Sequence, residues 1–158
     1  MFLGSALCEV GQDGSVTIPG FLSDALTGDV AELLVSKHAA EGCLVGYGHE
    51  HLETLSARTE ARRLADESRG EDARNHTRRM RRTFGIVEKM TRTGATITIP
   101  AAMRHLGKIG TLALFVGTGD SFEIWNPDLA IESDDEQFRD LATFRLNSRS
   151  GHDASGGH

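Results

Sequence analysis

Hydrophobic and polar positions alternate in two segments of the chain that closely resemble each other. Ser15-Val-Thr-Ile-Pro19 returns 81 residues later as Thr96-Ile-Thr-Ile-Pro100. In both, hydroxyl side chains alternate with β-branched apolar ones, and this period of two predicts a half-buried strand. Each segment ends at a proline that suits the first turn of a helix. The run Cys43–Tyr47 corresponds in the same way to Ser121–Trp125, at an offset of 78. The common order and spacing indicate an internal repeat.

Each copy of the repeat predicts two strands, a short helix, two further strands and a long helix. In the first copy these are expected near 2–10, 15–18, 20–26, 30–37, 43–47 and 49–69. In the second they are expected near 84–92, 95–99, 101–106, 111–117, 121–125 and 127–146. Asn126 and Pro127 supply an N-cap and a first-turn proline for the last helix. Because each unit is too small to bury much apolar surface alone, we expect the two units to share a core.

The elements divide the chain into four segments. Residues 1–70 form a first unit with its helix, 71–83 a basic helical linker, 84–146 a second unit with its helix, and 147–158 a disordered tail rich in Ser, Gly and His. The fold class is mainly β with α. One stripe of the linker helix has the spacing of a packed face and consists of Ala73, Thr77, Met80 and Phe84. Four arginines fan around the rest of that helix: Arg78, Arg79, Arg81 and Arg82.

Charge is distributed unevenly along the 158 residues, although the total is only −6. Residues 57–110 contain thirteen Lys and Arg residues against six acids, a net charge of +7, between flanks of −7 and −6. A basic middle third can mark an anionic partner, but it is also typical of a solvated helix face. For the arginines of the linker helix both interpretations stay open: a solvated face, or a cationic rim that attracts DNA.

Nothing in the sequence supports an enzymatic function, and no catalytic residue is assigned. Gly117–Ser121 is expected to join two strands, whereas a phosphate-binding loop leads from a strand into a helix. His49 and His51 lack the tight paired spacing of zinc ligands, even with Cys43 nearby, so we expect no metal and no cofactor. No segment approaches the length of a membrane span. Cys8 and Cys43 are isolated, which indicates a reducing cytoplasm.

The chain resembles the MraZ family of bacterial transcription regulators over residues 1 to about 146. The motifs that carry the resemblance are Met1-Phe-Leu-Gly4, Cys43-Leu-Val with the helix after it, Ile99-Pro-Ala-Ala-Met-Arg104 and Phe115-Val-Gly-Thr-Gly-Asp-Ser-Phe-Glu-Ile-Trp-Asn-Pro127. The last of these is the most specific.

The resemblance implies two tandem AbrB-like swapped-hairpin units, with a long helix closing each unit. It also implies a homo-oligomeric ring that binds short direct repeats in the promoter of a division and cell-wall gene cluster and represses that cluster. A cytoplasmic, nucleoid-associated protein without a small-molecule substrate would follow.

The hairpins of this chain depart from the family's Asp-x-x-x-Arg motif. The first copy reads Gly11-Gln-Asp-Gly-Ser15 and the second Thr91-Arg-Thr-Gly-Ala95, so both the Asp and the Arg are replaced. Asp13 puts an anion where the family has a cation, and we expect the first hairpin not to touch DNA. The candidate DNA-binding residues are therefore Arg92, Lys89, Arg104, Arg78, Arg79, Arg81 and Arg82.

Two functions remain compatible with these observations. The first is a sequence-specific repressor in which the second unit and Arg92 read the promoter, because an arginine on a hairpin can bond phosphate or a guanine edge. The second is an oligomerising homologue that has lost DNA binding and acts through protein partners. The preserved scaffold and the basic middle third favour the first function, and the altered hairpins favour the second.

Overall fold

The computed structural model describes residues 1–26 and 32–155. The first copy contains β1 (Ser5–Glu9), β2 (Ser15–Thr17), α1 (Gly20–Ala25), β3 (Leu33–Lys37), β4 (Leu44–Gly48) and α2 (His51–Ser68). Next come α3 (Ala73–Met80) and a π-helical turn, η1 (Arg81–Gly85). The second copy contains β5 (Val87–Thr93), β6 (Thr96–Thr98), α4 (Ala101–Leu106), β7 (Leu112–Gly117), β8 (Phe122–Trp125), α5 (Pro127–Ala130) and α6 (Glu136–Ser155). The predicted repeat is confirmed, although residues 30 and 31 of the first copy's third strand lie outside the described residues.

The strands of the two copies interleave in one antiparallel sheet. Its order is β1-β7-β8-β4-β3-β5-β6-β2. The hairpin strands β1 and β2 of the first copy pair with β7 and β6 of the second. In exchange, β5 of the second copy pairs with β3 of the first, and β4 pairs with β8 at the centre. The alternating segments found in the sequence lie opposite each other, with Val16 across from Ile97. The α+β class and the exchange of hairpins are thus confirmed.

One core serves both copies. Its fully buried side chains include Leu33 and Leu44 from the first copy and Phe115 and Phe122 from the second. The ring of Phe122 lies 5.1 Å from that of Phe2, centroid to centroid, so a residue near the start of the chain packs on the last strand. A second cluster beneath α5 and α6 consists of Cys43, Leu114, Trp125, Ala130 and Ala142. The expectation of a shared core is confirmed.

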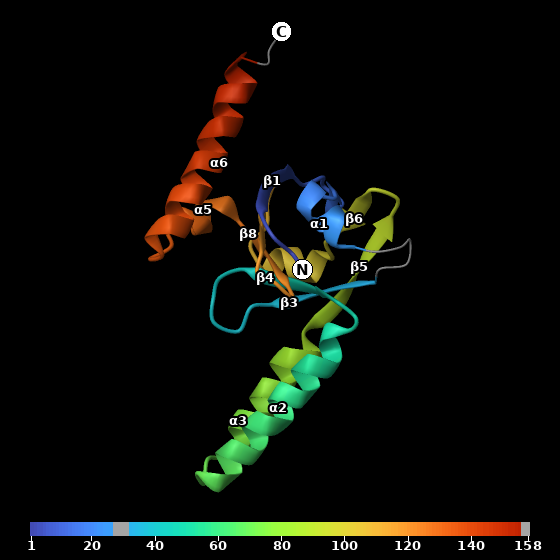
Figure 1. Ribbon diagram of the computed structural model, residues 1–158, viewed down its shortest axis with the longest axis vertical. Helices are drawn as coiled ribbons and strands as arrows, with labels where there is room; N and C mark the ends of the chain where they lie inside the picture. Colours follow the sequence, from blue (N-terminus) through green and yellow to red (C-terminus); the bar gives the residue numbers. More distant parts are fainter. Residues whose placement is uncertain (27–31, 156–158) are drawn as a thin grey trace.

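Two helical elements extend from opposite ends of the strand body (Figure 1). Helices α2 and α3 lie side by side and form a helical hairpin at one end, with the turn at Gly70. The segment predicted as a linker is therefore the returning arm of this hairpin. Helix α6 extends from the other end of the body.

The last helix differs from the prediction in two respects. Asn126 caps α5 as expected, since its side chain accepts a hydrogen bond from the Asp128 amide. The helix predicted over 127–146 is, however, interrupted after Ala130. Ser133 Oγ accepts a bond from the Asp135 amide, and Asp135 in turn accepts one from the Phe138 amide, so local side chains compete with the helix and begin a new one. The tail predicted to be disordered from residue 147 continues α6 as far as Ser155.

The packed face of α3 is also not the predicted one. The stripe formed by Ala73, Thr77, Met80 and Phe84 is exposed. His76, Arg79 and Thr83 instead lie at the partly buried positions. This face is selected by an ion pair between Arg79 and Asp66 of α2, and the hydrophobic spacing of the sequence gives no sign of that contact.

Candidate nucleic-acid interface

The second hairpin, formed by β5 and β6, carries Arg92 near its tip. Arg92 shares a strand face with Met90, which is buried, whereas the neighbouring Thr91 and Thr93 are exposed. Its side chain folds back along the hairpin, where Nε donates a hydrogen bond of 3.2 Å to the Gly94 carbonyl. Nη1 is enclosed and has no acceptor among the described residues. The guanidinium must therefore turn outward before it can contact a duplex.

Lys89 lies on the opposite, outer face of β5. Its side chain is 74% exposed, and Nζ is 2.7 Å from Oε1 of Glu32. The hydrogen bond that Lys89 donates to Glu32 raises the pKa of Lys89 and lowers the pKa of Glu32. Lys89 is thus charged at neutral pH, but a carboxylate compensates its charge.

The first hairpin presents an anion and is held by Arg104. Asp13 accepts hydrogen bonds from the Ser15 hydroxyl and amide, which hold the pKa of Asp13 below its usual value. Arg104 of α4 donates from Nη1 to the Gln12 carbonyl at 3.0 Å and from Nε to the Ile99 carbonyl at 3.1 Å. Arg104, a candidate for DNA contact, thereby connects the first hairpin to the second copy.

The arginines of α3 and η1 have different environments. Arg78, Arg81 and Arg82 are exposed, and their side chains form no ion pair or hydrogen bond with the residues described here. Arg79 is mostly enclosed, and its Nη2 lies 2.8 Å from Oδ2 of Asp66. Three of the four arginines are therefore available to an anionic partner, and the fourth connects the two helices.

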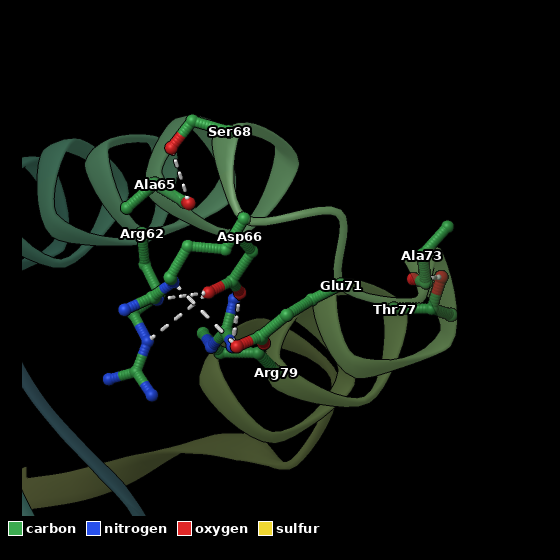
Figure 2. Close-up of polar contacts among 9 residues, drawn as sticks. Arg62, Ala65, Asp66, Ser68, Glu71, Ala73, Thr77 and Arg79 are labelled. Atoms are coloured by element: carbon green, nitrogen blue, oxygen red, sulfur yellow. Dashed lines mark hydrogen bonds and ion pairs between the residues drawn. The ribbon is translucent and has the colours of Figure 1, made fainter.

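Asp66 is the centre of the helical hairpin, and sequence reasoning missed it. It is only 4% exposed, and Figure 2 shows its carboxylate between Arg62 and Arg79. Arg69 Nη2 is 2.8 Å from Oδ1, and Arg62 Nε is 4.0 Å from the same atom. The hydrogen bonds from Arg69 and then Arg79 lower the pKa of Asp66. The spacing Arg62, Asp66, Arg69 places these residues on one helix face, which is the signal that was available.

Replacing Asp66 by Asn should lower the thermal midpoint of the helical hairpin more than Glu60→Gln, which removes an exposed partner of Arg63. Because the folded pKa of Asp66 lies below the ordinary value of about 3.9, its stabilisation is complete above that value. It is lost as the pH falls through the lower folded pKa. Helicity followed by circular dichroism at pH 7 and below pH 4 measures both effects. Equal midpoints for the two variants at pH 7 would contradict this role for Asp66.

Comparison with known proteins relates most of the chain to two curated relatives. It is 30% identical over 132 residues to a protein of Rhodospirillum rubrum named transcriptional regulator MraZ, covering 80% of this chain and 79% of the relative. The chain belongs to the MraZ family. A second protein named transcriptional regulator MraZ, from Thioalkalivibrio sulfidiphilus, is 26% identical over 142 residues. That alignment covers 89% of this chain and 89% of the relative. No protein-family model matches the sequence.

Within this MraZ family member, one cluster has the composition of a metal site. His38, Cys43 and Glu123 bring their ligand atoms within 4.8 Å of one another. Nδ1 of His38, however, accepts hydrogen bonds from the backbone amides of Ala40 and Glu41, each at 3.0 Å. In the neutral ring the proton is then on Nε2, which lies 3.5 Å from Glu123 Oε2, whereas a ligating nitrogen needs a free lone pair. Burial also raises the pKa of the Cys43 thiol. The arrangement favours a hydrogen-bonded network over a metal.

The remaining sequence candidates for ligands are separated from this cluster in the MraZ fold. His49 lies 3.5 Å from Glu32, and His51 lies 3.6 Å from Asp120. Each histidine thus has a carboxylate neighbour of its own. No described helix is long and apolar enough to cross a membrane.

Proposed function

We propose that this MraZ-family protein is a DNA-binding transcriptional regulator that represses the promoter of a division and cell-wall gene cluster. The relation to two proteins named transcriptional regulators, over four-fifths of the chain or more, carries the proposal. Its partner would be promoter DNA with short direct repeats, and its setting the cytoplasm and the nucleoid. Regulation by binding needs neither a cofactor nor catalytic residues.

Two cationic surfaces on this chain support a DNA partner. Arg78 lies on α3 and Arg81 and Arg82 on η1, the turn that follows it, whereas Arg92 lies near the tip of the second hairpin. Strand β5 follows η1 and carries Arg92 near its end, so a continuous stretch of chain carries both surfaces (Figure 1). Such cations release counterions when they meet phosphates, which makes the affinity fall steeply with salt. Sequence discrimination is assigned to Arg92, because a hairpin tip can enter the major groove.

A homo-oligomeric ring would bring several copies of these surfaces to repeated DNA sites and multiply weak contacts. Large apolar side chains exposed on this chain suit burial between copies. Leu3 is 70% exposed and Phe144, on the extended helix α6, is 62% exposed. The mass of the assembly in solution, measured by light scattering, tests this part of the proposal.

Arg92→Ala should weaken binding to the protein's own upstream DNA by about tenfold or more, since one good base contact contributes about 1–3 kcal/mol. Fluorescence anisotropy with that DNA and with a scrambled duplex, at two salt concentrations, measures the change. Arg58→Ala is the matched control, because it removes the same charge from α2, where Arg58 is 65% exposed. Unchanged promoter affinity in Arg92→Ala would remove Arg92 as the reader.

An oligomerising homologue without DNA binding is the second candidate function. It is favoured by the state of the hairpins, in which Arg104 bonds backbone carbonyls, Lys89 pairs with Glu32 and Arg92 is folded back. The same anisotropy measurement separates the two functions. A stable assembly with no promoter affinity even at low salt supports the second function, and tight selective binding eliminates it.

A further inference from the structure

A groove lies between the helical hairpin and the turn that joins β3 to β4. Its larger part, about 490 Å³, is lined by Arg62 of α2, Arg78 and Arg79 of α3, Arg82 of η1, and Glu71. A smaller part of about 230 Å³ is lined by Lys37, His38 and Ile86. Ala39 and Arg82 line both parts, so the two are contiguous. The combined space has the size of a small-molecule site.

The basic side chains that line this groove outnumber the carboxylates that pair with them. Asp66 neutralises Arg79 directly and lies farther, 4.0 Å, from Arg62. The one acid of the lining, Glu71, lies 3.7 Å from Arg69, which is outside the lining. Arg78 and Arg82 have no partner among the described residues, and they lie four residues apart on one helix face. The groove therefore presents at least two free guanidinium groups side by side.

Arg79 adds an unsatisfied donor to the wall. Its Nη2 is bonded to Asp66, but Nη1 is buried and has no acceptor among the described residues. A buried charged donor without an acceptor is costly. Arg79 lines the groove, so a small rotation of its guanidinium would bring Nη1 to an oxyanion bound there. The phosphates of a duplex, in contrast, meet donors that stand out from the surface. An enclosed donor beside two exposed ones suits a small anion with several oxygens.

We propose that this groove binds a small anion carrying several phosphate groups. Planar guanidinium groups bond phosphate through paired hydrogen bonds, and Arg78, Arg79 and Arg82 all line the groove. The lining described above has no Phe, Tyr or Trp on which a nucleobase could stack, so recognition rests on the phosphates. The π-helical turn η1 brings Arg82 and Thr83 to the groove, and turns of this kind are frequent at functional sites. This site is separate from Arg92, the proposed reader of DNA, and shares Arg78 and Arg82 with the cationic surface proposed to meet the phosphates of a duplex.

The test is isothermal titration calorimetry of the full-length protein with inorganic tripolyphosphate at low salt without magnesium. Arg82→Ala should weaken binding by about tenfold, because it removes one charged double donor. Arg81→Ala is the control, since Arg81 is the adjacent exposed arginine and does not line the groove. It should change the affinity by less than about twofold.

Two results would overturn the proposal: no binding by the wild type at millimolar tripolyphosphate, or equal losses in both variants. Equal losses would indicate general attraction to a basic surface. Tripolyphosphate binding that persists in Arg92→Ala, whose promoter affinity is tested separately, distinguishes this site from the proposed reader.

Discussion

Replacing Phe122 by Ala should lower the free energy of unfolding by about 3–5 kcal/mol, the usual cost of deleting a fully buried phenylalanine. Phe122 has no exposed surface, and its ring lies 5.1 Å from that of Phe2 and 6.1 Å from that of Phe115. It belongs to β8, which pairs with β7 of its own copy and β4 of the other. The cavity would therefore open where the two copies meet.

Denaturant unfolding followed by fluorescence of Trp125, the single tryptophan, measures the loss at a fixed protein concentration. Leu64→Ala is the control, because Leu64 is 54% exposed on α2 and its truncation should cost less than about 0.5 kcal/mol. If the two variants lost equal stability, the assignment of Phe122 to a core shared by the two copies would be wrong.

The repeat could be predicted from sequence because its signals are local. Alternation in Ser15–Pro19 and Thr96–Pro100 identified β2 and β6, and the prolines correctly placed the short helices after them. The pairing of these two strands with each other depends on contacts some 80 residues apart, which no periodicity records. The exchange of hairpins was expected only from the resemblance to a family.

The errors in the helices have a common physical cause. Helical spacing was read from apolar residues, whereas polar side chains decided the outcome. Ser133 and Asp135 bond backbone amides and interrupt the predicted last helix. Asp66 attracts Arg79 and turns the face of Met80 outward. An ion pair or a capping bond of this kind involves one or two residues, so it barely alters the pattern on which the prediction rests.

For the candidate site, the sequence predicted the charge of the segment but not the partner of each charged side chain. The positive charge of the middle third was evident from the sequence, and most of it lies on the helical hairpin, η1 and the second hairpin. The partner of each cation was not evident, since Glu32 reaches Lys89 from the other copy and Arg104 reaches Gln12 across the exchanged hairpins. Which arginines remain free for a ligand is therefore a property of the fold.

Gly14→Ala should destabilise the protein by about 2–5 kcal/mol, of which about 1–2 come from a left-handed backbone and about 1–3 from overpacking. Gly14 has φ +88°, and a Cβ there would lie 2.4 Å from the Ile99 carbonyl oxygen and 2.8 Å from Nε of Arg104. The Gly14 carbonyl also accepts the Ile99 amide at 2.9 Å. A side chain at Gly14 would thus separate the first hairpin from α4.

Gly94→Ala is the matched control in the second hairpin. Gly94 has φ +60°, and a Cβ there would meet no atom within 4 Å, so only the backbone term of about 1–2 kcal/mol applies. Denaturant unfolding of both variants measures the difference. The first hairpin is closely packed on Arg104, whereas the second is open at its turn. The difference in lost stability between the two variants therefore measures how far the packing of the two hairpins has diverged. Equal losses would place Arg104 away from the first hairpin and return it to the candidates for DNA contact.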